Sequence, residues 1–102
     1  MSLPVVLRPL AYADVQQIQT ELEIRTTGLG DTFLDRLQEF LTRIESMPQM
    51  YPEVWRSIRA GRLHTFQYVV YYVIESDRVE ILAVLHGSRD VTAWQSRVGT
   101  SS

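Results

Sequence analysis

The sequence predicts an α+β domain in which an antiparallel sheet packs against a hairpin of two helices. Apolar residues recur at helical spacing over residues 10–47, with one interruption at 27–30. Two long apolar stretches, 63–75 and 78–86, flank a short polar turn and have the composition of strands. With one strand before the helices, the order of elements is β-α-α-β-β-β, followed by a short helix. A chain of 102 residues forms a single such domain, expected over residues 1–98.

The helical half is expected to follow a short strand at residues 3–8. A first helix is expected over 10–26, and Gly28 can adopt the left-handed conformation that ends it. A second helix is expected over 31–47, where its first residues can cap it. The apolar stripes are Ala11, Val15, Ile18 and Leu22 in the first helix, and Phe33, Leu34, Leu37, Phe40, Leu41, Ile44 and Met47 in the second. The short connection between the helices predicts an antiparallel hairpin.

The remaining strands are expected at 54–59, 63–75 and 78–86. A last helix is expected from Asp90, a good N-cap residue, to about Arg97. Residues 99–102 are expected to form a flexible tail.

A two-residue turn at Ser76 and Asp77 sets Glu75 opposite Arg78 and fixes which residues share a face. The helix-facing set is then Phe66, Tyr68, Val70, Tyr72, Ile74, Val79, Ile81, Ala83 and Leu85. The open face has Thr65, Gln67, Val69, Tyr71, Val73, Glu80, Leu82, Val84 and His86. A three-residue loop at 60–62 is predicted to join the preceding strand. It adds Trp55, Ser57 and Arg59 to the open face and turns Val54 and Ile58 toward the helices.

The composition excludes several chemistries. All ten basic residues are Arg, so no Lys can form a Schiff base or a P-loop. The absence of Cys excludes thiol catalysis and Cys-ligated zinc. His64 and His86 do not make a metal site without further ligands, and we expect neither a metal nor a cofactor. The net charge of −2 and the lack of a long apolar run predict a cytoplasmic protein without affinity for membranes or specific DNA sequences.

Polar residues within and beside the apolar strands are the candidates for function. The candidates for binding are Arg59, Arg62, Thr65, Gln67, Trp94 and Arg97, and His86 and Arg89 lie near them in sequence. Guanidinium groups bind phosphates and carboxylates, so an anionic partner is expected. Trp94 with Arg97 could anchor a partner, since Trp and Arg dominate interface hot spots. The alternative is that Trp94 packs the last helix onto the sheet.

Four segments of the chain resemble the RelE/ParE toxin superfamily, and the ParE-like plasmid-stabilisation proteins in particular. These segments are LRPLAYADVQQI, FLDRLQEFLTRIESMPQMYP, IRAGRLHTFQYVVYYVI and ILAVLHGSRDVTAW, and the resemblance spans about residues 5–97. It implies the RelE/ParE-like fold and the toxin half of a type II toxin–antitoxin pair, neutralised by a cognate antitoxin. Within the superfamily, RelE-like members cleave mRNA on the ribosome, whereas ParE-like members inhibit DNA gyrase.

The missing charges favour the ParE-like branch. RelE-like enzymes place Arg at the positions of Tyr68 and near Gly87 in this chain. The alternative is a ribosome-dependent mRNA endoribonuclease, in which His86 acts as acid or base while Arg59 and Arg89 hold the phosphate. A structural role for His86, and an inactive member that only binds partners, also remain open. The expected partners are the antitoxin and either gyrase or the ribosome, and open sheet edges predict self-association without antitoxin.

Overall fold

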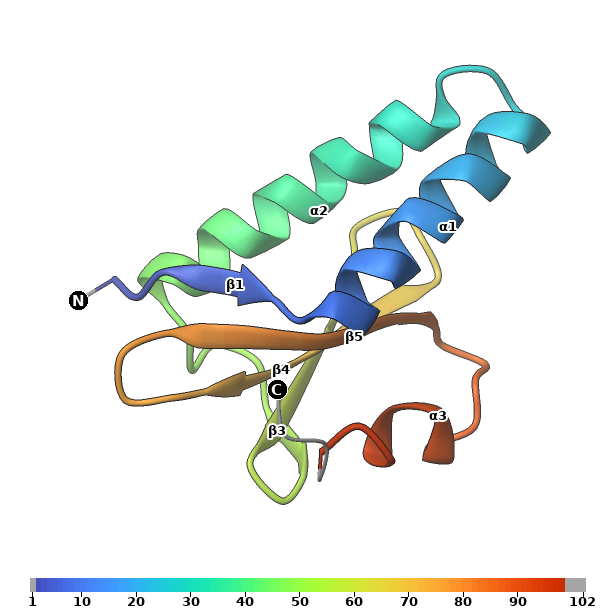
Figure 1. Cartoon of the computed structure of the whole chain (residues 1–102). Coiled ribbons are helices and arrows are strands. Elements are labelled where there is room, and N and C mark those ends of the chain that lie inside the picture. The colour runs from blue at the N-terminus through green and yellow to red at the C-terminus, as the bar shows by residue number, and fades with distance from the viewer. Residues whose placement is uncertain (1, 99–102) are drawn as a thin grey trace.

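The computed structural model describes residues 2–98, so the expected tail at 99–102 lies outside the described residues. Its elements are β1 (Val5–Leu7), α1 (Pro9–Arg25), α2 (Leu29–Ser46), β2 (Glu53–Trp55), β3 (Ile58–Arg62), β4 (Tyr68–Ile74), β5 (Val79–His86) and α3 (Thr92–Gln95). The five strands form one sheet in the order β1-β5-β4-β3-β2. The α1–α2 hairpin covers one face of this sheet and α3 lies on the other (Figure 1). The predicted fold class is confirmed, although β1 joins β5 in parallel rather than antiparallel.

The helical hairpin is held at its tip by a carboxylate. Glu23 of α1 accepts hydrogen bonds from the backbone N–H groups of Gly28, at 2.8 Å, and Gly30, at 3.0 Å. Gly28 adopts a φ of 88°, the left-handed conformation expected of it. Because Glu23 satisfies these N–H groups from the preceding helix, α2 begins at Leu29, two residues before its predicted start.

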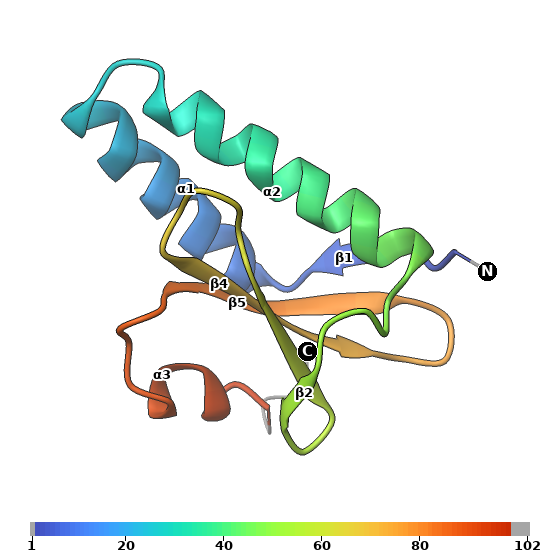
Figure 2. The same cartoon turned by 180° about the vertical axis from the view of Figure 1, so that it is seen from behind.

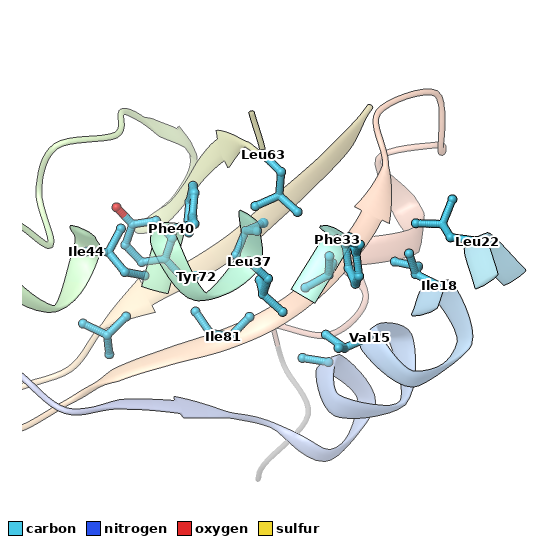
Figure 3. Packing of buried hydrophobic residues seen from close by; sticks show 14 residues of the cluster. Val15, Ile18, Leu22, Phe33, Leu37, Phe40, Ile44, Leu63, Tyr72 and Ile81 are labelled. Atoms are coloured by element: carbon cyan, nitrogen blue, oxygen red, sulfur yellow. The ribbon is translucent and has the colours of Figure 1, made fainter. Parts of the chain in front are cut away.

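The core beneath the hairpin combines side chains from both helices and the sheet, which point toward one another in Figure 3. It contains Ala11, Val15, Ile18, Leu22, Phe33, Leu37, Phe40, Ile44, Leu63, Val70, Tyr72, Val79, Ile81 and Val84. Fully burying a large apolar side chain stabilises the fold by roughly 1.5–3 kcal/mol. All four residues of the predicted first-helix stripe are buried here, so the helical periodicity located this face correctly.

The turn predicted at 60–62 is wrong, because these residues lie within β3. Gly61 is a site of close approach instead: a Cβ there would lie 2.6 Å from the Tyr51 ring and 2.8 Å from the Phe40 ring. The true turn is at Arg56 and Ser57, between β2 and β3 (Figure 2). Arg56 has a φ of 54° and its guanidinium lies 4.4 Å above the Trp55 ring, a cation–π contact.

This different turn reverses the predicted faces of Ile58 and Arg59, whereas Trp55 lies on the α3 side as predicted. Ile58 is 1% exposed on the α3 side of the sheet, and Val54 is 48% exposed. Arg59 pairs with Tyr72, a residue of the helix-facing core, so Arg59 lies on the helix side. The prediction that Arg59 lies on an open face is therefore wrong.

The register predicted for the β4–β5 hairpin is correct only near its turn. The pairs Ile74–Val79 through Tyr72–Ile81 follow the prediction. Leu82 is then an extra residue on β5, a β-bulge, so that Tyr71 pairs with Ala83. Beyond the bulge the faces are exchanged: Val84 packs under the helices, while Ala83 and Leu85 pack on the α3 side.

The backbone groups that the bulge leaves unpaired are satisfied by side chains. Val84 N–H donates to Asp14 Oδ2 of α1 at 3.0 Å. Arg97 Nη1 donates to the Leu82 carbonyl at 3.0 Å and to Asp14 Oδ2 at 2.7 Å. The Asp14–Arg97 ion pair therefore joins α1, the bulge and the segment after α3.

The second face of the sheet is covered by α3, so it is not the open face that the sequence predicts. Trp94 is 5% exposed, stacks on Tyr71 at 4.6 Å between ring centroids and meets Trp55 edge-on at 6.0 Å. Together with Ile58 and Leu82, these aromatic residues form a second apolar cluster. In the part of the chain that the structure describes, no helix has the length and apolar character needed to cross a membrane.

Candidate partner-binding groove

A groove runs between the second half of α1, the end of β5 and the loop from β3 to β4. It consists of two adjoining hollows of about 280 and 310 Å³, which share Arg25, Tyr68 and His86. Leu22, Leu29, Phe66 and Tyr68 supply apolar lining, and Thr65, Gln67 and Arg89 supply polar groups. We call this surface the His86 groove.

The charge of the His86 groove is positive. Among residues 2–98, Arg25 and Arg89 form no ion pair, whereas Asp14 is paired with Arg97. Glu21 is the remaining carboxylate of the lining and accepts a hydrogen bond from Gln17 at 3.2 Å. Two unpaired guanidinium groups beside an apolar floor suit a partner that offers both carboxylates and apolar side chains.

The imidazole of His86 is held by the loop that follows β5. Its Nδ1 accepts the backbone N–H of Ser88 at 3.1 Å and lies 2.7 Å from Ser88 Oγ. Because a backbone N–H can only donate, the neutral ring carries its proton on Nε2. The ring also meets Tyr68 edge-on at 5.7 Å. In its neutral form, His86 therefore presents a hydrogen-bond donor at Nε2, rather than the free lone pair that a general base needs there.

The loop between β3 and β4 forms one end of the groove in a strained conformation. Thr65 has a φ of 68°, which a β-branched residue rarely adopts. The loop is closed by Leu63 N–H, which donates to the Tyr68 carbonyl at 3.0 Å. It is tied to the end of β5 because Gly87 N–H donates to the Gln67 carbonyl at 2.7 Å. Thr65 and Gln67 are therefore brought beside His86, as expected from the sequence.

Arg59 does not join His86 and Arg89, so the predicted set of three phosphate-handling side chains is not assembled. Arg59 lies below the end of α2, where it donates to the Tyr51 carbonyl at 2.7 Å and pairs with Glu53 at 3.4 Å. From the strand register, the Cα atoms of Arg59 and His86 are roughly 16 Å apart. Arg59 is thus a packing residue of the β2–β3 region.

The other predicted binding residues also lie outside the groove. Arg62 is exposed at the end of β3, next to Val69 on the α3 side. Trp94 is buried by its stacking on Tyr71, so its position follows the packing alternative rather than that of an exposed anchor. Arg97 is engaged by Asp14 and by the bulge.

Arg25 and Tyr68 are groove residues that the sequence reasoning did not select. The sequence does contain a pattern that indicates Arg25. Its spacing from Asp14, Ile18 and Glu21 is helical, so the four residues lie along one side of α1. Tyr68 was assigned to the core, and its contacts with Phe33 and Phe66 agree with that. Its edge nevertheless reaches the groove beside His86.

Comparison with models of known protein families identifies the family. A family model described as the ParE toxin of the type II toxin–antitoxin system parDE matches residues 5–91. The chain belongs to the ParE toxin family. The resemblance found in the sequence is thereby confirmed, including its ParE-like branch. No curated protein gives a significant match.

A solved structure supports the ParE fold. The chain is similar to one titled as the chromosomal ParDE TA system from P. aeruginosa, with a TM-score of 0.61 and 13% identity. The match covers 83% of this chain and 96% of that chain. Within residues 2–98, no group of three or more His, Asp or Glu side chains could hold a metal ion.

Proposed function

We propose that this ParE-family chain is a cytoplasmic toxin that arrests growth by inhibiting DNA gyrase and is neutralised by a cognate antitoxin. Membership of the ParE family supports a toxin of a type II system, and the resemblance to ParE-like proteins supports gyrase as its target. The chain would act by binding and not by cleaving a substrate.

The observation that carries this proposal is the placement of His86. Cleavage of RNA by attack of its 2′-hydroxyl needs a base, an acid and cations at one phosphate. Here Nδ1 of His86 is occupied by Ser88, and Arg59 is held elsewhere by Tyr51 and Glu53. A groove with unpaired cations and no assembled acid–base pair favours binding over catalysis.

A supercoiling assay with purified gyrase tests the proposal. The chain alone should inhibit supercoiling at micromolar concentration, and an equimolar amount of antitoxin should restore it. Primer extension on translated mRNA provides the competing outcome: cuts that disappear in His86→Ala would identify an endoribonuclease instead. Normal growth on induction without antitoxin would point to an inactive member of the family.

A further inference from the structure

β1 is the outermost strand on one side of the sheet that residues 2–98 form. The strand order β1-β5-β4-β3-β2 gives it β5 as a neighbour on its inner side and no strand on its outer side (Figure 1). All of its residues are apolar. Val6 is 46% exposed, while Val5 and Leu7 are partly buried. An uncovered strand edge of this kind can pair with another chain.

The hydrogen bonds between β1 and β5 show which main-chain groups of β1 point outward. The Pro4 carbonyl accepts a hydrogen bond from β5 at 2.8 Å, and Arg8 N–H donates one to β5 at 3.0 Å. Because the main-chain groups of successive strand residues point to alternate sides, those of Val5 and Leu7 point away from β5. Within the described chain, these N–H and C=O groups have no hydrogen-bond partner.

A second copy of the chain can pair with all of these groups at once. Two identical edge strands related by a two-fold axis run antiparallel. With the axis at Val6, Val5 of each copy lies opposite Leu7 of the other, and such residues can exchange both of their hydrogen bonds. Every outward N–H and C=O of Val5 and Leu7 is then bonded, and the two Val6 side chains meet at the axis.

The apolar side chains beside β1 also fit this arrangement. A hollow of about 180 Å³ lies between β1 and α2, and Val5 and Leu41 supply its apolar lining. Val5 and Leu7 both pack against the core on the helix side of the sheet. Because opposite residues point to the same face of a sheet, Leu7 of the second copy would lie next to this hollow. It would cover apolar surface that is only partly buried in a single copy.

The helix ends nearest to β1 have complementary charge. Leu3 N–H donates to the Glu45 carbonyl at 3.0 Å, so the C-terminal end of α2 lies beside the residue that precedes Pro4. In the pair, Pro9, the first residue of α1, would lie opposite Leu3 of the other copy. The N-terminal end of α1 has partial positive charge and no acidic residue in its first turn. It would therefore lie near the negative end of α2 and the Glu45 carboxylate.

The opposite edge of the sheet is less suited to pairing with a copy of itself. β2 is also three residues long, but its register with β3 shifts between Glu53 and Trp55, as at a β-bulge. Bulges and charged side chains are features by which edge strands avoid pairing. Glu53 supplies such a charge, and its side chain is 53% exposed. β1 has neither feature, because its register is regular and its residues are apolar.

We infer that the outer edge of β1 is a self-association surface, at which two copies of the chain pair as antiparallel strands about Val6 and join their sheets into one. The inference goes beyond the proposed function, because it does not depend on which target the chain inhibits. Two strands of three residues bury little surface, so the dissociation constant is expected to be on the order of 100 µM.

Sedimentation equilibrium of the full chain, from micromolar to millimolar concentration, tests the self-association. The mean mass should rise from 11.8 kDa toward twice that value. Val6→Lys places like charges opposite each other at the axis and should weaken the dimer by about tenfold or more. Val54→Lys is the matched control, because Val54 is 48% exposed on β2, and it should leave the association unchanged within about twofold.

A rescue experiment separates lost pairing from lost folding. Mixing Val6→Lys with Val6→Asp places opposite charges at the axis and should restore association, whereas each variant alone should remain monomeric. Two unfolded variants could not restore it. The mixture should recover at least the association of the wild-type chain.

A disulfide tests the register. The sequence contains no Cys, so a Val6→Cys variant has a single thiol. Opposite residues at a non-hydrogen-bonded position of an antiparallel pair have Cα atoms about 4.5 Å apart, which a disulfide can span. Val6→Cys should therefore form a covalent dimer under mild oxidation, whereas Val54→Cys should remain largely monomeric.

Amide exchange provides the main-chain evidence. The N–H groups of Val5 and Leu7 should become protected as the concentration rises, while that of Val6, which faces β5, should not change. A mass that stays at 11.8 kDa at millimolar concentration, or equal effects of the Val6 and Val54 substitutions, would overturn the inference. Protection of Val5 and Leu7 only in a complex with the antitoxin would also overturn it, because the antitoxin would then be the occupant of this edge.

Discussion

The outer edge of β5 is sealed by a strand in its first half and covered by side chains in its second half. Its first half, around Glu80, is paired on both edges, by β1 and by β4. Its second half, after the Leu82 bulge, has Asp14 and Arg97 in place of a neighbouring strand. Side chains satisfy fewer main-chain groups than a strand does, so within the described chain the Val84 carbonyl and the His86 N–H have no hydrogen-bond partner, although Val84 itself is buried. The bulge therefore separates the sealed half from a half that side chains cover.

Glu80 shows how the sealed half is stabilised. Its side chain is 7% exposed, and each carboxylate oxygen is held by a guanidinium group. Arg8 Nε donates to Oε1 at 2.8 Å and Arg78 Nε donates to Oε2 at 2.7 Å. Hydrogen bonding by Arg8 is the main cause that lowers the pKa of Glu80, with Arg78 adding to it, while burial acts in the opposite direction. The carboxylate is thus ionised in the folded protein.

The largest expected effect is from removing this carboxylate. Glu80→Ala would leave two guanidinium groups without their counter-ion, and we expect the free energy of unfolding to fall by about 3 kcal/mol. Glu75→Ala is the control, because Glu75 is exposed near the same turn, and should change it by less than about 0.5 kcal/mol. Urea unfolding of both variants makes the measurement. Equal losses of unfolding free energy in Glu80→Ala and Glu75→Ala would contradict the structural role of the sealed half.

A smaller effect is expected from Asp14→Ala, in the half of β5 that side chains cover. The substitution removes the acceptor of Val84 N–H and the partner of Arg97, and should lower the free energy of unfolding by about 2 kcal/mol. It should also speed the amide exchange of Val84, while that of Ile81 in the sealed half should follow only the global loss of stability. Slow exchange of Val84 in the variant would show that Asp14 does not cover this edge.

The smallest effect is on the pH dependence of stability. Because the pKa of Glu80 is lower in the folded than in the unfolded chain, the unfolded chain binds more protons between these two values. This part of the stability is present above the unfolded pKa, near 4.3, and is lost as the pH falls through the folded value. The wild-type chain should thus lose stability more steeply than Glu80→Gln in acid. Parallel curves in urea titrations below pH 5 would refute this.

The sequence predicted the helical half well because helical periodicity depends on local spacing. It located the Ser76–Asp77 turn for the same reason, since a two-residue turn is a local signal. It could not locate the Leu82 bulge, because Ile81, Leu82 and Ala83 are all apolar and their order shows no change of face. Gly61 was wrongly predicted to lie in a turn, because a glycine can mark either a turn or a close approach. Here it is required by the close approach of the Phe40 and Tyr51 rings.

The candidate site was predicted in part for a related reason. Thr65, Gln67, His86 and Arg89 come together because the Gly87–Gln67 hydrogen bond joins the loops that carry them. Arg59 was chosen as a cation that could bind a phosphate or carboxylate, and Arg97 as an interface anchor together with Trp94. Their partners, Glu53 and Asp14, are supplied by folding. Unpaired cations such as Arg25 can be recognised only once these pairs are known.

Amide hydrogen exchange along β5 of the free chain tests the central claim most directly. The account predicts slow exchange at Ile81, which is paired within the sheet, and at Val84, which Asp14 covers, and fast exchange at His86, whose N–H is unpaired. The exchange of Gly87 should be slow, because it donates to Gln67, which excludes fraying of the strand end as the cause. Protection of His86 equal to that of Val84 would show that the His86 N–H has a partner and would contradict the account.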